Sequence, residues 1–310
     1  RLTCMTVLDD HTITILSNIG IIAFVAISAY LLLLAGLVSF GQQAFFGVGA
    51  YAAAIATVMW SWPLGLGLAA GAIAGAAASL ILGALTLRLR GLYFAIATLA
   101  FAEMGRLALE LTSYRRVVDG ELVGPDGVDG FRDIRAVFES GITPGGYFVV
   151  ILGLLALVVA LVIMVERRDA GRRLRATGED ETLAELQGIN VDAVRLLAVT
   201  AAGAIAGLGG GLYAHMLTYI DPKAFGIMLG VHSLAYGLIG GLGTVLGPIL
   251  GVIIDIGLLE STRLFKGYRM IVFGGLVAIL LIWRPRGLLD EAFMRRLRTA
   301  FEWRRARARR

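Results

Sequence analysis

Apolar runs of about the length that crosses a bilayer recur from one end of this sequence to the other. A spanning helix needs about 20 mostly apolar residues. Six stretches have roughly this length: residues 12–38, 63–87, 91–111, 146–165, 193–216 and 269–284. With 58% hydrophobic residues and a mean hydropathy of +0.81, the chain carries more apolar surface than one soluble core of this size can bury. The sequence therefore predicts an all-α, polytopic membrane bundle.

Three further apolar stretches are shorter or are interrupted by glycine. Residues 42–60, 227–243 and 245–260 suit broken, tilted or re-entrant helices, which a membrane protein tolerates where neighbouring helices cover them. The segments together predict about eight to ten crossings within a single membrane domain over residues 1–310. The first run is too long for a signal peptide and lacks a small-residue cleavage site, so we expect it to be a spanning helix.

Arginines predict the orientation, because cytoplasmic loops keep an excess of Lys and Arg next to the membrane. They gather at Arg88 and Arg90, in the loop of residues 166–192 and in the tail of residues 285–310, which we expect inside. The loop of residues 112–145 and the segment 217–226 then lie outside. The net charge of +5 sits in these loops and the tail, which is typical of membrane topology and not of a nucleic-acid-binding surface.

Glycines spaced by four residues fall within several of the predicted helices. Examples are Gly67, Gly71 and Gly75, and then Gly203, Gly207 and Gly211. This spacing places small residues on one helix face, where they allow two helix backbones to approach closely in lipid. We expect most of these glycines to serve packing.

The loop of residues 166–192 contains a segment with its own helix signals. Thr177 is a candidate cap, acidic residues follow it at the positive end of a helix, and Gly188 suits the left-handed position after the last turn. The segment predicts a helix of two to three turns with Leu183 and Leu186 on one face. So short a helix is stable only when it docks, either on the transmembrane bundle or on a partner protein.

Several stretches resemble one transporter family. Ala184, Glu185 and Gly188 form an Ala-Glu-x-x-Gly core that is similar to the coupling motif of ABC importer permeases. Four further stretches, in the same order along the chain, resemble the LivM-type permeases of branched-chain amino acid importers: residues 39–51, 90–101, 240–248 and 284–288. The resemblance runs from about residue 12 to residue 289.

The resemblance implies a subunit of an ABC importer in the bacterial inner membrane, with its C-terminus in the cytoplasm. The implied partners are a homologous second permease subunit in a heterodimer, two cytoplasmic ATP-binding subunits, a periplasmic substrate-binding protein and membrane lipid, with no nucleic acid. The residues that would couple to the ATPase are Arg175, Glu179, Asp180, Glu181, Leu183, Ala184, Glu185, Leu186 and Gly188. The family commonly places Ile-Arg before the acidic residues, where this chain has Ala-Thr-Gly at 176–178 and so lacks one basic residue of the pattern.

No enzymatic, cofactor or metal signal accompanies this pattern. No phosphate-binding loop of the Gly-x-x-x-x-Gly-Lys-Ser/Thr type occurs, so we expect ATP to be used by partner subunits and no cofactor to be bound by this chain. Cys4 is the single cysteine, and the three histidines lack ligand spacing, so no metal site is predicted. A membrane enzyme would need a cluster of His, Asp or Glu near one interface, and none appears.

A zwitterionic substrate needs polar groups along its path, and broken helices expose backbone N–H and C=O groups for that purpose. The candidate path residues are Ser39, Gln42, Gln43, Tyr51, Glu103, Gly240, Gly241 and Thr244. For the polar side chains among them, hydrogen bonding between helices is an equally good explanation.

Two carboxylates lie well inside apolar runs, away from the ends, where a charge is costly and often functional. These are Glu103 and Asp255, which would be the coupling groups if the protein were a secondary transporter driven by protons or sodium. Arg106 follows Glu103 by three residues, so an ion pair on one helix face is the simpler explanation for Glu103. An ABC permease for urea or short amides is the remaining alternative, and a scaffolding role would leave the broken helices unexplained.

Overall fold

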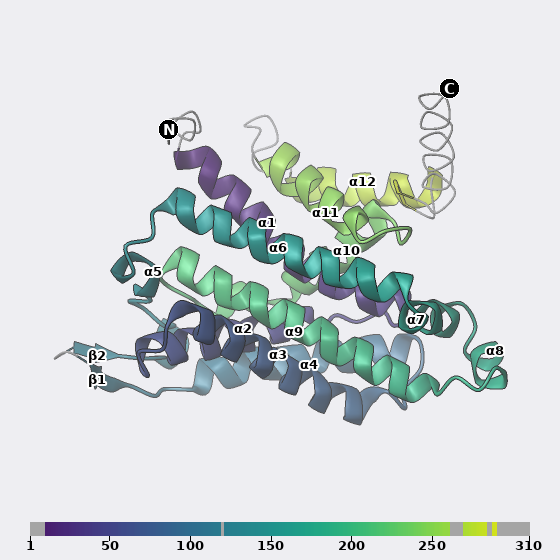
Figure 1. The fold of residues 1–310 in the computed structure, drawn as a ribbon, viewed down its shortest axis with the longest axis horizontal. Helices are drawn as coiled ribbons and strands as arrows, with labels where there is room; N and C mark the ends of the chain where they lie inside the picture. The colour runs from purple at the N-terminus through teal and green to yellow at the C-terminus, as the bar shows by residue number, and fades with distance from the viewer. Residues whose placement is uncertain (1–9, 119–120, 261–268, 284–286, 290–310) are drawn as a thin grey trace, which may run out of the picture.

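The computed structural model of the chain describes residues 10–118, 121–260, 269–283 and 287–289. The predicted tail of residues 285–310 and the motif that begins at residue 284 lie mostly outside this part. Within it the fold is helical, apart from one small hairpin (Figure 1). The predicted all-α, polytopic bundle is confirmed.

Among the described residues, five helices are long and apolar enough to cross a membrane. They are α1 (Asp10–Leu34), α3 (Leu64–Thr86), α4 (Leu92–Leu111), α6 (Pro144–Arg167) and α9 (Val191–Leu217). The apolar window of α1 is 78% buried, whereas that of α6 is 17% buried. Helix α1 therefore runs through the interior of the bundle, whereas the rest of this chain leaves most of the surface of α6 uncovered.

The remaining apolar stretches form shorter helices, as the sequence predicts for all of them except residues 269–284, which it predicts at full spanning length. They are α2 (Gln42–Val58), α10 (Ile227–Gly240), α11 (Leu246–Val252), the π-helix η3 (Ile253–Glu260) and α12 (Arg269–Trp283). Helix α11 continues directly into η3. Helix α12 agrees with the predicted range, but its 15 residues are fewer than the roughly 20 that a perpendicular crossing needs.

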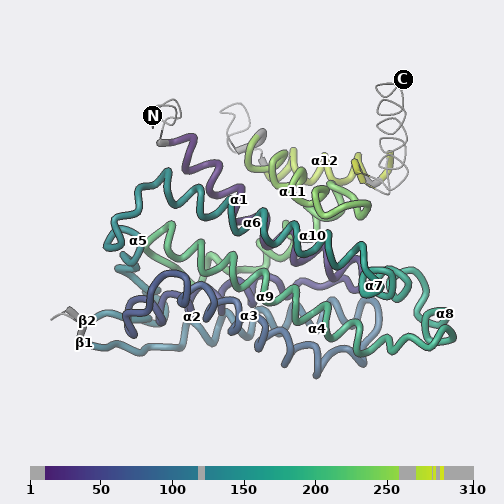
Figure 2. Tube along the Cα trace, viewed as in Figure 1, coloured from purple at the N-terminus to yellow at the C-terminus, as the bar shows by residue number. Residues whose placement is uncertain are grey.

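The remaining elements gather at the two ends of the bundle (Figure 2). One end carries the antiparallel strands β1 (Arg116–Val118) and β2 (Glu121–Val123), with η1 (Gly127–Asp129), α5 (Ala136–Glu139) and η2 (Pro222–Phe225). The opposite end carries α7 (Asp169–Glu179) and α8 (Glu181–Leu186). Phe131 and Ile220 exchange two backbone hydrogen bonds of 2.9 Å, which join the loop of residues 112–145 to the segment 217–226. Both segments thus lie at the same end, as the predicted topology requires.

Helices α2, α3 and α9 cross at glycines without intervening side chains. A Cβ atom at Gly49 would overlap the backbone of Gly207, and one at Gly75 would overlap the carbonyl oxygen of Gly203. A Cβ atom at Gly207 would in turn overlap the carbonyl oxygen of Gly71. The predicted role of the glycine spacing in close helix packing is confirmed at this crossing.

Candidate functional site

Buried polar side chains gather where α2 begins. Ser39, Gln42 and Gln43 are buried, and neither side-chain amide forms a hydrogen bond with any other described residue. A buried polar group without a partner costs about 1–3 kcal/mol, so such groups call for an explanation. Two adjacent amides of this kind mark a place where a polar ligand would find hydrogen-bonding groups inside an apolar bundle.

Two helices flank this polar group. The backbone N–H of Phe40 donates to Thr98 Oγ1 of α4 at 3.1 Å, and that of Gly41 donates to Ser39 Oγ at 3.1 Å, which fixes the turn before α2. On the other side, Gly230 of α10 leaves room for Gln43, because a Cβ atom at Gly230 would overlap Gln43 Oε1. The start of α2 is therefore held between α4 and α10.

The other predicted path residues do not join this group. The Tyr51 ring lies 6.4 Å from the Phe131 ring and 6.2 Å from the Phe225 ring, measured between centroids, near the end that carries the β-hairpin. Gly240, Gly241 and Thr244 lie in and beside the turn between α10 and α11, at the end that carries α7. The hydroxyl groups of Tyr51 and Thr244 are also buried without a hydrogen-bond partner among the described residues. The candidate residues are thus spread along the bundle and do not line one closed pocket.

Glu103 and Asp255, the two carboxylates well inside apolar runs, both have hydrogen-bonding partners. Glu103 accepts hydrogen bonds from Arg106 Nε at 2.9 Å and from Arg106 Nη2 at 2.5 Å, and Arg106 also pairs with Glu110. This is the ion pair on one helix face that the spacing suggests. Asp255 is buried and accepts a hydrogen bond of 2.7 Å from the hydroxyl of Tyr236.

The helix in the loop of residues 166–192 begins later than the sequence predicts. The prediction that Thr177 caps it is wrong, because Thr177 lies inside α7 and donates to the carbonyl oxygen of Arg173. Asp180 is the cap instead, and its carboxylate accepts from the backbone N–H of Leu183 at 3.0 Å. The helix α8 therefore has six residues, fewer than predicted, and ends before Gly188, whose φ of +78° is the expected left-handed conformation.

Helix α8 has one face on the bundle and one facing away from it. Ala184 is buried, and Glu181 forms ion pairs with Arg90 at 3.1 Å and Arg195 at 3.2 Å. On the other face Leu183 is 54% exposed and Leu186 is 80% exposed. Glu179 and Glu185 are exposed as well. The helix is thus anchored through Glu181 and Ala184 and presents an apolar pair of leucines beside acidic side chains.

Arg175 lies on the inner side of α7. Its Nη2 atom lies 3.5 Å from Glu166 Oε2, and its Nη1 atom donates to the carbonyl oxygen of Leu242 at 3.5 Å. Among the predicted coupling residues, Arg175 therefore contacts the interior of the bundle, unlike the exposed leucines of α8.

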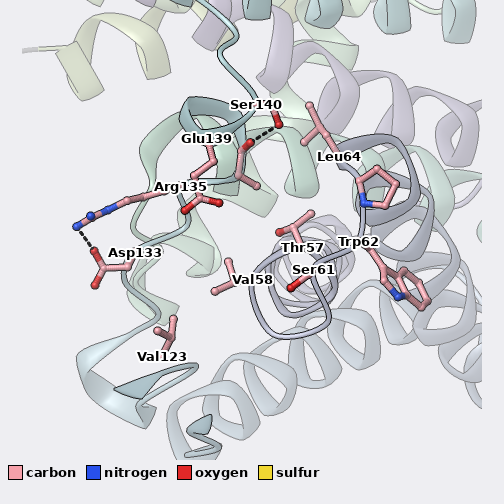
Figure 3. A pocket seen from close by; sticks show the side chains of 12 residues that line it. Thr57, Val58, Ser61, Trp62, Leu64, Val123, Asp133, Arg135, Glu139 and Ser140 are labelled. Carbon is pink, nitrogen blue, oxygen red and sulfur yellow. Dashed lines mark hydrogen bonds and ion pairs between the residues drawn. The ribbon is translucent and has the colours of Figure 1, made fainter. Parts of the chain in front are cut away.

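A hollow of about 590 Å³ opens at the opposite end of the bundle. Figure 3 shows Thr57 and Ser61 on one side of it and, on the other, Arg135 and Glu139 from the loop of residues 112–145. Ser61 and Asp133 line it with φ angles of +53° and +61°, conformations that non-glycine residues rarely adopt and that often mark functional sites. The patterns in the sequence do not predict this hollow. The loop of residues 112–145 does mix arginines with acidic residues, and that mixture is the signal in the sequence that could have indicated a polar site.

The amino-acid sequence matches a known family. The family model described as the branched-chain amino acid transport system permease component matches residues 11–283. The chain belongs to this permease family. Membership of this family and the five long apolar helices of the described residues agree on a multi-pass membrane protein.

Relatives of this permease include proteins from bacteria and an archaeon. The permease protein LivM of the high-affinity branched-chain amino acid transport system of Escherichia coli K12 is 30% identical over 283 residues, which cover 83% of this chain and 64% of LivM. The LivH permease protein of the same organism is 31% identical over 157 residues, half of each chain. A probable LivH of Methanocaldococcus jannaschii is 31% identical over 140 residues, which cover 44% of this permease and 42% of that protein. No solved structure matches.

Proposed function

We propose that this chain forms half of the translocation path of an ATP-driven importer for branched-chain amino acids. The family description and the names of LivM and LivH support the substrate class. The other half is a homologous permease subunit, and the similarity of this chain to both LivM and LivH favours such a pair. Two cytoplasmic ATP-binding subunits and a periplasmic substrate-binding protein complete the proposed importer, so the partners bind ATP and this chain binds no cofactor.

The observation that carries the proposal is the helix pair α7–α8 at one end of the bundle. A six-residue helix gains little stability from its own backbone hydrogen bonds, yet α8 holds two leucines in solvent-exposed positions. Its inner face is already occupied by the contacts of Ala184 and Glu181. The outer face, with Leu183, Glu185 and Leu186, is therefore the part of the chain on which we expect an ATP-binding subunit to dock.

The proposed orientation places α7 and α8 in the cytoplasm. Arginines are frequent in and before α7, and the tail that follows α12 is rich in them as well, which agrees with cytoplasmic segments of a bacterial inner-membrane protein. The β-hairpin, α5 and η2 then lie in the periplasm, where the hollow beside Glu139 is open to an arriving substrate.

The proposed path runs from this hollow to the turn between α10 and α11. Gln42 and Gln43 lie between the two ends on a helix that begins within the bundle, and their unpartnered amides can replace water around the charged groups of an amino acid. Neutral amides suit this task because they bind a zwitterion without leaving a fixed charge buried when it departs.

The test uses the assembled complex in lipid, with ATP hydrolysis measured in the presence of the binding protein loaded with leucine. Glu185→Arg reverses a charge on the proposed docking face, and the matched control Asp169→Arg reverses an exposed charge on α7. We expect stimulated hydrolysis in the wild type and the control, and its loss in Glu185→Arg. Equal stimulation in all three proteins would contradict the docking assignment.

A further inference from the structure

A chain of polar contacts inside the bundle joins four separate elements. The hydroxyl of Tyr30 on α1 donates to Glu166 Oε1 at the end of α6, with 2.6 Å between the two oxygen atoms. The other carboxylate oxygen of Glu166 lies 3.5 Å from Arg175 Nη2 on α7, and Arg175 Nη1 donates to the carbonyl oxygen of Leu242 in the turn between α10 and α11. Tyr30 is fully buried, and 14% of the Glu166 side chain is exposed.

The contacts depend on one another. A carboxylate that is largely removed from water is costly unless it is paired and hydrogen-bonded, and here Tyr30 and Arg175 each satisfy one oxygen atom of Glu166. Loss of either partner leaves the carboxylate incompletely compensated. The network therefore holds Arg175 in one position relative to α1 and α6.

Helix α7 is also fixed to the end of α1 through its backbone. A Cβ atom at Gly178 would overlap the carbonyl oxygen of Leu34, and one at Gly36 would lie 3.0 Å from the Cα atom of Gly178. Only Asp180 separates α7 from α8. A force applied to α8 is thus transmitted to α7 and to the Arg175 side chain on its inner face.

The turn that Arg175 contacts is tightly packed. Gly240 and Gly247 approach so closely that a Cβ atom on either would overlap the backbone of the other. The backbone N–H groups of Leu288 and Leu289 donate to the carbonyl oxygens of Ile239 and Gly240, at 3.0 and 2.9 Å. Because the turn is packed in this way, its displacement shifts α10, the helix on which Gly230 abuts Gln43.

We propose that Arg175, positioned by Glu166 and Tyr30, transmits the movement of the docked α7–α8 segment to the turn between α10 and α11. The proposal rests on the proposed function, and it assigns to Arg175 an internal positioning role in place of contact with the ATPase. Docking on α8 then moves α10 against the start of α2, and so opens or closes the path beside Gln43.

The first test measures amino acid transport and ATP hydrolysis in the reconstituted complex for Arg175→Gln. Arg172→Gln is the matched control, because it removes the same charge from the same helix, where Arg172 is exposed and pairs with Asp169. We expect Arg175→Gln to lower the amount of leucine transported per ATP by at least about fivefold, the lower end of typical coupling energies. The control should stay within about twofold of the wild type, as expected for a surface substitution.

Tyr30→Phe provides a second variant, because it removes one hydroxyl from the network and keeps the ring. We expect it to lower transport per ATP in the same direction, and Arg175→Lys to retain more transport than Arg175→Gln. A parallel loss of transport and ATP hydrolysis, with their ratio unchanged in all variants, would overturn the proposal, since it would indicate a structural role alone.

Hydrogen–deuterium exchange tests the link independently of transport. Peptides that cover residues 241–245 should exchange faster in Arg175→Gln than in the wild type or in Arg172→Gln. If the exchange of these peptides were the same in Arg175→Gln as in the wild type, the contact between Arg175 and Leu242 would not be a mechanical link, even if ATP drives transport by the wild-type complex. If Arg175→Gln exchanged faster but the wild-type complex transported leucine without ATP, the result would instead contradict the proposed function, and with it the coupling role of Arg175.

Discussion

Gly207→Ala tests whether backbone contact between α3 and α9 holds the bundle together. The added methyl group would overlap the carbonyl oxygen of Gly71 and would lie 3.0 Å from the Cα atom of Gly75. Both atoms belong to a helix backbone and cannot turn aside as a side chain can, so the two helices must separate. Overpacking of this kind costs about 1–3 kcal/mol.

The alanine also stabilises the helix in which it lies, and this gain must be subtracted from the overpacking cost. Alanine is favoured over glycine in a helix by about 0.8–1.0 kcal/mol. Because the methyl group meets two backbone atoms, we place the overpacking cost in the upper half of its range, and subtraction of the gain leaves a loss of roughly 1–2 kcal/mol in the free energy of unfolding. Gly153→Ala on α6 is the matched control, because nothing lies within 4 Å of the position of its new methyl group.

The assay is reversible unfolding in mixed micelles of a mild detergent and sodium dodecyl sulfate, followed by the helical circular dichroism signal. We expect Gly207→Ala to unfold at a lower fraction of dodecyl sulfate than the wild type, and Gly153→Ala to unfold at an equal or higher fraction. A Gly207→Ala protein as stable as the wild type would refute the argument from close backbone approach.

Three further predictions concern helix α8, the buried carboxylate and the start of α2. Asp180→Ala removes a helix cap that is typically worth about 1 kcal/mol, so amide exchange within α8 should become several times faster. Asp255→Asn keeps an acceptor for the Tyr236 hydroxyl and should leave leucine uptake within about twofold of the wild type, whereas a proton-coupling role would abolish uptake. Gly230→Ala places a methyl group against the Gln43 amide and should reduce leucine uptake in the same assay. Its control is Gly274→Ala, whose methyl group would have nothing within 4 Å and should leave uptake unchanged.

Much of the fold follows from patterns that are local in the sequence. The length of an apolar run sets the length of a crossing, so all five long helices fall on predicted stretches. Glycine spacing likewise predicts close helix approach, because residues four apart share one helix face. The left-handed conformation of Gly188 is predictable for the same reason, since it depends only on the end of its own helix.

The remaining features depend on distances that a sequence does not contain. Thr177 and Asp180 are both good caps, and the choice between them follows from the packing of Gly178 against Leu34, which extends α7 past Thr177. Similarly, Tyr30 and Glu166 are 136 positions apart, and neither stands out in its own segment. The hollow beside Glu139 also requires the loop of residues 112–145 to fold back on the end of α2.

The source of energy for leucine uptake tests the central claim most directly. The complex would be reconstituted in liposomes with the second permease and the ATP-binding subunits, and leucine accumulation measured with the loaded binding protein outside and ATP or its non-hydrolysable analogue inside. Accumulation that requires hydrolysable ATP, and that persists without any proton or sodium gradient, is the predicted result. Accumulation driven by such a gradient in liposomes that contain this chain alone would contradict the account.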